Sequence, residues 1–153
     1  MNKVKFTLLF LFINFSALYV GSFLMGEGPT DVWYQSLNKA PWTPPGWVFG
    51  AAWTLIMICF SIYLGFLFSE ANTKKVQLTF LLQLILNVSW NYIFFNQKWV
   101  SLGVLVLILL IVTLLFFFVN LSKDLKKVRL LLLPYIIWLC IATSLNLYIL
   151  IHN

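Results

Sequence analysis

The chain has 153 residues, of which 62% are hydrophobic and only 9% are charged. A water-soluble domain of this length cannot bury so much apolar surface, so the composition excludes a soluble globular protein and indicates a protein solvated by lipid. The formal net charge of +6 is then explained by orientation in the membrane and by contact with anionic headgroups. It does not indicate a nucleic-acid partner.

Five apolar stretches are each long enough to cross a bilayer, which takes about 20 helical residues. We predict helices at about residues 4–25, 47–68, 78–95, 100–121 and 130–151. The later connectors are short, whereas residues 26–46 form a long first loop. The sequence therefore predicts an all-α membrane protein with a single domain, residues 1–153: a bundle of five transmembrane helices with a long structured first loop.

The first apolar stretch has some features of a signal peptide, because Lys3 and Lys5 precede it and Gly21 and Ser22 follow its core. That core of about 18 residues is longer than the usual 7–15 of a signal peptide. We therefore expect a membrane span.

Basic residues are distributed unevenly between the two ends of the predicted bundle. The loops on one side have only Lys39 and Lys98. The other side, which includes the N-terminus, has Lys3, Lys5, Lys74, Lys75, Lys123, Lys126, Lys127 and Arg129. Because cytoplasmic loops are enriched in Lys and Arg, we expect a plasma-membrane protein with its N-terminus in the cytoplasm and its C-terminus outside.

Polar side chains form a row along the third predicted helix. Gln83, Asn87 and Asn91 follow one another at four-residue intervals, with Trp90 beside them, so they share one helix face. Such amides often join transmembrane helices through hydrogen bonds worth about 0.6–2 kcal/mol. The alternative is that the row lines a pocket.

The fifth predicted helix repeats this spacing with Trp138, Ala142 and Asn146. A face that combines indoles, amides and a small residue is typical of an apolar pocket with a few polar anchors. Trp33 and Trp99, by contrast, fit the aromatic belt of a membrane interface.

The first loop and the following helix start read WYQSLNKAPWTPPGWVFGAAW, residues 33–53. Pro41, Pro44 and Pro45 exclude a continuous helix and favour extended chain. We expect a stiff aromatic lid over the outer end of the bundle. The alternative is an aromatic belt followed by a helix that starts at proline.

Other features exclude several classes of site. Cys59 and Cys140 lie within apolar stretches and are expected to be buried, and His152 is the only histidine. We therefore expect no metal site and no haem-ligating histidine within the membrane. The fourth predicted helix offers almost no polar chemistry, and we expect it to face lipid or an oligomer partner.

Three stretches together resemble a known family: WYQSLNKAPWTPPGWVFGAAWTLI, QLILNVSWNYIFF and PYIIWLCIATSLN. They are similar to the signature blocks of the translocator proteins, or tryptophan-rich sensory proteins (TspO/MBR, the peripheral-type benzodiazepine receptor family), in a bacterial-type form. The resemblance covers essentially the whole chain. It implies a homodimer of five-helix bundles and a pocket under the first loop for tetrapyrroles such as protoporphyrin IX, isoquinoline carboxamides and benzodiazepine-type drugs.

The resemblance also implies which residues bind the ligand, and Gln83 is added from its place in the amide row. The expected ligand-binding residues are Tyr34, Pro44, Pro45, Trp53, Gln83, Asn87, Trp90, Phe94, Trp138, Ala142, Leu145 and Asn146.

The sequence departs from the family pattern at several positions. Leu147 and Ile151 replace the aromatic residue and the arginine of the vertebrate cholesterol motif, which leaves cholesterol recognition doubtful. Val106 stands where many members have an acidic residue, and Leu102 where a tryptophan is found.

Two functions follow as hypotheses. In the first, Trp53, Trp90 and Trp138 stack on a metal-free porphyrin and the amides bind its polar groups. In the second, suggested by the family, the bound porphyrin is its own chromophore and is oxidised in light, with Trp53 and Trp138 as electron or radical donors. No further cofactor and no conventional catalytic group is expected. The alternative is transport or sensing of tetrapyrroles without chemistry.

Overall fold

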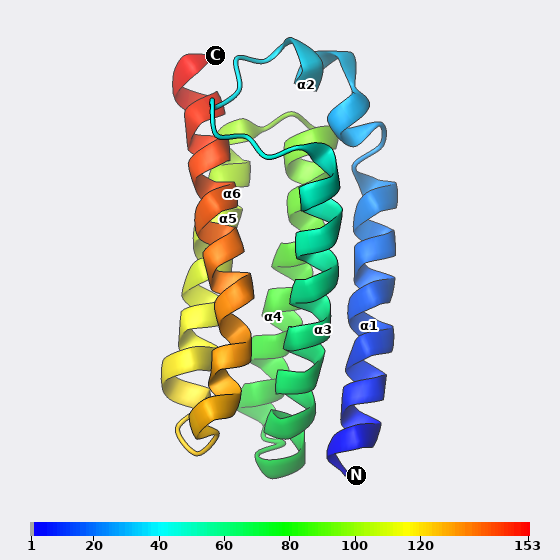
Figure 1. Cartoon of the computed structure of the whole chain (residues 1–153), viewed down its shortest axis with the longest axis vertical. Coiled ribbons are helices and arrows are strands. Elements are labelled where there is room, and N and C mark those ends of the chain that lie inside the picture. The colour runs from blue at the N-terminus through cyan, green and yellow to red at the C-terminus, as the bar shows by residue number, and fades with distance from the viewer. Residues whose placement is uncertain (1) are drawn as a thin grey trace.

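The protein, described here by a computed structural model that covers residues 2–153, is a bundle of helices (Figure 1). Five of them are long and apolar enough to span a membrane. The main helices are α1 (Lys3–Leu24), α3 (Gly46–Glu70), α4 (Lys74–Asn91), α5 (Val100–Phe116) and α6 (Leu133–His152). The predicted all-α class and five-helix bundle are confirmed.

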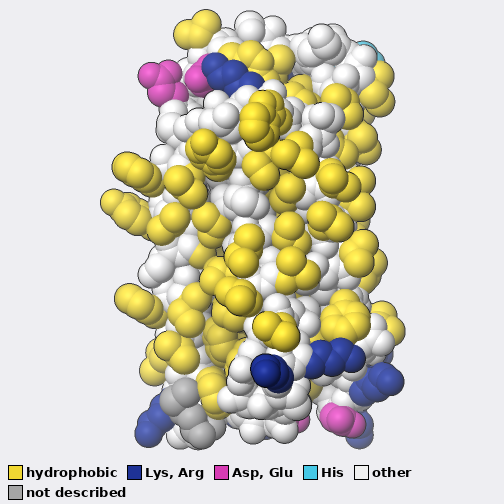
Figure 2. Space-filling model, turned by 180° about the vertical axis from the view of Figure 1, so that it is seen from behind, with side chains coloured by type: hydrophobic (Ala, Val, Ile, Leu, Met, Phe, Trp, Pro, Cys, Tyr) yellow, Lys and Arg dark blue, Asp and Glu magenta, His cyan; other side chains and the backbone are white. Residues whose placement is uncertain are grey.

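The surface of the bundle is apolar along its flank. In Figure 2, hydrophobic side chains cover most of the visible flank, and Lys and Arg gather mainly at one end. Phe12, Tyr19 and Phe23 of α1 each expose more than 70% of their surface. Exposing so many apolar side chains on the flank of one bundle costs free energy in water but not in hydrocarbon. The protein is an integral, multi-pass membrane protein.

The start of α4 shows how capping extends a helix beyond its apolar stretch. The Thr73 hydroxyl accepts a hydrogen bond from the Val76 amide at 3.3 Å, which satisfies one free N–H group of the first turn. The helix therefore begins at Lys74, earlier than the apolar pattern predicts, because its first turn is polar and lies at the membrane surface.

α1 and α3 pack closely along much of their length. Midway along α1, the Asn14 amide donates to the Ser61 hydroxyl at 2.8 Å, and both side chains are buried. Nearer the N-terminal end, the side chain of Thr7 lies directly over Gly65. A hydrogen bond and a glycine contact thus fix the register of the two helices.

α5 is only partly the lipid-facing helix expected from its sequence. Val104, Leu107, Leu110 and Leu114 are buried at three- and four-residue intervals, so one face belongs to the core. The expectation for one cysteine was also wrong, since Cys140 is exposed and Cys59 is half-buried. An apolar thiol is compatible with a lipid-facing surface.

The first loop forms a lid across the end of the bundle opposite the N-terminus (Figure 1). It contains two short helices, η1 (Gly28–Thr30) and α2 (Val32–Ser36). Both precede Pro41, and the stretch that holds Pro41, Pro44 and Pro45 has no helix, as these prolines predict. Its chain then reaches α6, where Trp42 Nε1 donates to the Ser144 hydroxyl at 3.1 Å. The Asn153 side chain bonds both the N–H and the C=O of Asn38, at 2.8 and 3.1 Å.

Replacing Gly65 by alanine should destabilise the protein. A Cβ atom there would meet the Thr7 side chain and lie 3.0 Å from the Lys3 carbonyl oxygen, so α1 would have to move away from α3. The matched control is Gly50→Ala, because no atom lies within 4 Å of a Cβ at Gly50 and alanine favours the helix by about 1 kcal/mol. Thermal unfolding in detergent should show a lower Tm for G65A and an equal or higher Tm for G50A. A Tm of G65A at or above that of wild type would contradict this packing.

Candidate functional site

Five aromatic rings meet where the lid contacts the third span, and we call them the lid cluster: Trp33 and Tyr34 of the lid, and Trp90, Phe94 and Phe95 of the third span. Trp90 and Phe94 are stacked, with centroids 5.4 Å apart and an angle of 8°. The rings of Trp33 and Tyr34 contact Phe94 edge-on at 5.8 and 6.3 Å. The lid thus lies directly on the aromatic side chains of the third span.

A π-helical turn places two of these rings. Residues Tyr92–Asn96 form η2, which continues α4 as a π-helix. This wider turn shifts the following side chains around the helix axis relative to an α-helix. The adjacent residues Phe94 and Phe95 are both buried, whereas Tyr92 is exposed.

Four further rings line the interface of α3 and α6, and we call them the seam cluster: Phe49, Trp53, Tyr135 and Trp138. Phe49 contacts Trp138 edge-on at 5.3 Å, and Trp53 contacts Tyr135 at 5.8 Å. The two tryptophans with a predicted redox role therefore lie in one seam. Trp90 packs against the hydrophobic core that contains this seam and also against Phe94 and Phe95, so it connects the two clusters.

Two buried amides belong to the helices that carry these clusters, Gln83 to α4 and Asn146 to α6. The Gln83 Nε2 group donates to the Tyr135 hydroxyl at 2.9 Å, which joins α4 to the seam. Asn146 Nδ2 donates to the Ala142 carbonyl of its own helix at 3.1 Å. A Cβ at Gly103 would lie 3.2 Å from Phe94 Cδ2 and 3.7 Å from Asn146 Oδ1, so glycine allows α5 to approach both side chains.

Three buried side-chain atoms in residues 2–153 have no hydrogen-bond partner: Gln83 Oε1, Trp90 Nε1 and Asn146 Oδ1. Gln83 and Asn146 expose only 1% and 5% of their surface. A buried polar group without a partner is destabilising by about 1–3 kcal/mol. That all three belong to the predicted site makes this region suited to a ligand with both donors and acceptors.

The other predicted site residues are placed as follows. Asn87, Ala142 and Leu145 are buried on the inward faces of α4 and α6. Pro44 is half-buried and Pro45 exposed. Pro45 is the N-cap of α3, so these prolines direct the lid chain into the helix, and neither belongs to the two aromatic clusters.

The chain matches the model of the TspO/MBR family over residues 7–152. The chain belongs to this family. It is 34% identical over 137 residues to the tryptophan-rich protein TspO of Archaeoglobus fulgidus, which covers 88% of each chain. It is 35% identical over 127 residues to the tryptophan-rich sensory protein of Cereibacter sphaeroides, covering 76% of this chain and 73% of that one. It is 32% identical over 134 residues to the human translocator protein, covering 84% and 78%.

Four residues at the candidate site of this TspO/MBR protein were not predicted from the sequence: Trp33, Phe95, Tyr135 and Gly103. Trp33 is not simply an interface-belt residue, because its half-buried ring packs on Phe94. Phe95 could not be found from an α-helical spacing, since it is turned inward by the π turn. Tyr135 had a signal in its position three residues before Trp138, on the same helix face.

Asn91 does not extend the amide row of this TspO/MBR chain into the site. A Cβ at Gly21 would lie 2.7 Å from Asn91 Nδ2, so this amide faces α1. Its Nδ2 group donates to the Asn87 carbonyl at 3.4 Å. The row therefore divides, with Gln83 directed toward α6 and Asn91 toward α1.

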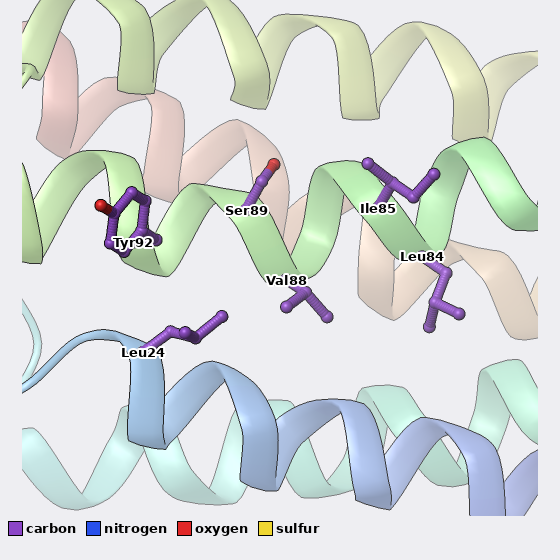
Figure 3. Close-up of a pocket in the computed structure, with 6 residues that line it drawn as sticks. All are labelled: Leu24, Leu84, Ile85, Val88, Ser89 and Tyr92. Carbon is purple, nitrogen blue, oxygen red and sulfur yellow. The ribbon is translucent and has the colours of Figure 1, made fainter.

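A hollow of about 540 Å³ lies elsewhere, between α1 and α4 (Figure 3). Its lining consists of Leu24, Leu84, Ile85, Val88, Ser89 and Tyr92. Ser89 already donates to the Leu86 carbonyl at 3.1 Å, so the hollow offers little polar chemistry. None of these lining residues belongs to either aromatic cluster, so the hollow is not the pocket expected beneath the lid.

No group of three or more His, Cys, Asp or Glu side chains within residues 2–153 has the geometry to hold a metal ion. The lid itself contains one perturbed group. Burial raises the pKa of the Tyr34 phenol above its usual value. Lys39 Nζ lies 4.9 Å from the centre of this ring and donates to the Tyr34 carbonyl at 2.9 Å.

Proposed function

We propose that this protein binds a metal-free tetrapyrrole, such as protoporphyrin IX, beneath its lid. The observation that carries the proposal is the coincidence of three unpartnered buried polar atoms with two aromatic clusters. Membership of the TspO/MBR family supports the same ligand class.

The chemistry of a free-base porphyrin complements these atoms. Its central pyrrole nitrogens and its peripheral carboxyl groups together include donors and acceptors, and its faces stack on aromatic rings. Gln83 Oε1 and Asn146 Oδ1 are acceptors, whereas Trp90 Nε1 is a donor. No histidine lies among them, since His152 is the only one and stacks on Tyr148 outside the clusters. This favours a metal-free ring over haem.

Admission of a macrocycle requires the lid to move. Phe94 exposes only 1% of its surface because Trp33 and Tyr34 lie against it. A ligand that enters past Phe94 must move these lid rings aside during its entry. The same site would take smaller flat ligands of the isoquinoline carboxamide and benzodiazepine types, whose carbonyl groups accept hydrogen bonds.

A chemical step is the second part of the proposal. In visible light the excited porphyrin accepts one electron from Trp53 or Trp138, because indole is the most easily oxidised aromatic side chain. Dioxygen then oxidises the reduced ring, and the ring returns one electron to the indole radical, so dioxygen is the net oxidant and the tryptophan is regenerated. Both tryptophans lie in the seam cluster, within the same core as Trp90. Without this step, binding would serve transport or sensing of tetrapyrroles.

We also propose that the lid lies outside the plasma membrane and the N-terminus in the cytoplasm, and that the protein forms a homodimer. The charge bias supports the orientation. In a variant without its native cysteines, Ser36→Cys should react with a membrane-impermeant maleimide on intact cells, whereas Lys123→Cys should react only after permeabilisation. The reverse pattern would overturn the orientation.

Replacing Asn146 by leucine should separate stability from binding. The variant removes a buried acceptor without a partner, so its Tm should equal or exceed that of wild type. Its affinity for protoporphyrin IX, measured by quenching of tryptophan fluorescence in the dark, should fall about tenfold, the equivalent of one lost hydrogen bond of ~1.4 kcal/mol. Unchanged affinity would show that Asn146 does not contact the ligand.

Light should destroy bound porphyrin in a tryptophan-dependent way. Under visible light in air, wild-type protein should lose the porphyrin absorption bands faster than free porphyrin does, and Trp138→Phe should retain binding but slow this loss at least tenfold. The matched control is Trp47→Phe, because Trp47 is 75% exposed at the start of α3. Equal rates in W138F and wild type would exclude an electron-transfer role for Trp138. Saturable binding with a stable spectrum would favour a carrier or receptor.

A further inference from the structure

Lys98 has an unusual backbone conformation. It lies in the three-residue connector between η2 and α5, and its φ angle is +59°, a region that side chains other than glycine and asparagine rarely adopt. The next residue, Trp99, has φ −87° and ψ 78°, and the Val100 amide donates to the Lys98 carbonyl at 3.2 Å. Such a backbone persists only where surrounding contacts hold it.

Two contacts of its ammonium group explain why lysine occupies this position. Lys98 Nζ lies 3.4 Å from Asp31 Oδ1 and 5.6 Å from the centre of the Trp33 ring. Asp31 Oδ1 also accepts the Trp33 amide at 2.7 Å, which caps α2. The connector is thereby joined to the first turn of the lid helix.

The contact continues into the candidate site. The Trp33 ring that Lys98 covers packs on Phe94 at 5.8 Å, and Phe94 stacks on Trp90 at 5.4 Å. Lys98 touches none of the unpartnered polar atoms. Any effect on a ligand must therefore pass through the position of Trp33.

This tether differs in kind from the others that hold the lid. On the α6 side, Trp42 and Asn153 use neutral hydrogen bonds. Within the described part of the chain, the Lys98–Asp31 pair is the one ion pair between the lid and the rest of the bundle. Its side chains are 41% and 25% exposed, so dissolved salt can screen it.

We propose that Lys98 is a positioning residue that acts through Trp33: with Asp31 it forms a salt-sensitive latch that holds the lid on the aromatic rings, and ligand exchange requires this latch to open. The ligand named in this inference rests on the proposed function. The role of the ion pair in holding the lid does not depend on which ligand binds.

The first test measures hydrogen exchange of residues 28–37 in nanodiscs. Lys98→Asn removes the charge but tolerates the left-handed backbone, and Asp31→Asn removes the charge but keeps a good helix cap. Each variant should exchange about two- to fivefold faster than wild type, as expected for a partly exposed ion pair. Hydrogen exchange in the double variant should be no faster than in either single variant. Lys98→Arg keeps the charge and should exchange at the wild-type rate.

Salt and a distant charge provide the controls. Raising the salt concentration from about 10 mM to about 500 mM should accelerate lid exchange in wild type but not in either charge-deleted variant. Lys123→Asn, at the opposite end of the bundle, makes the same change in net charge and should leave lid exchange unchanged. Exchange that is equal in K98N, D31N and wild type would overturn the latch, as would additive effects in the double variant.

The second test uses stopped-flow mixing with protoporphyrin IX in the dark. Because the latch is closed both before and after binding, its loss should raise the association and dissociation rates by similar factors and change Kd less than twofold. A change in Kd without a change in rates would overturn the gating role. If wild-type protein fails to bind protoporphyrin IX at all, the proposed function fails, while the hydrogen-exchange result still decides whether the latch exists.

Discussion

The inability of hydrocarbon to form hydrogen bonds is the constraint on which this structure depends. Every polar side chain within a span has to find its partner inside the bundle. Asn14 pairs with Ser61, and Gln83 donates to Tyr135, so the amides that appear isolated in sequence become contacts between helices. These contacts, together with the close approach of α1 to Gly65, set the register of the helices. The apolar side chains then face either one another or the lipid at little difference in free energy.

The same constraint makes the remaining free groups informative. A buried acceptor such as Asn146 Oδ1 has no water from the membrane to satisfy it, so its persistence beside aromatic rings indicates a role other than packing. The sequence left two interpretations of Gln83 open, a hydrogen bond between helices or the lining of a pocket, and its two polar atoms fit one each. Its Nε2 group joins α4 to α6, and its Oε1 atom is left without a partner. One side chain thus joins two helices and leaves one acceptor free for the proposed ligand.

The lid is an outer wall of the site as well as a connector. The rings of Trp33 and Tyr34 lie against Phe94 and cover it. Contacts at both ends of the lid hold the lid in place, an ion pair near α5 and neutral hydrogen bonds at α6. A lid built in this way combines an apolar inner surface with polar fastenings at the water interface. The same lid can therefore cover the candidate site with rings and remain attached through polar contacts that water and salt can weaken.

The five spans, the inward faces of Gln83 and of Trp138 with Asn146, and the aromatic lid were determined by the sequence itself, because hydropathy and a 3.6-residue period are local properties. Other features needed the tertiary structure. The π turn that buries Phe95 breaks that period, and the left-handed backbone of Lys98 has no sequence signature outside glycine and asparagine. The direction in which Trp33 faces was set by the fold of the lid, since an indole suits both a membrane interface and an aromatic core. Whether it faced outward or inward depended on what α4 and α5 placed beneath it.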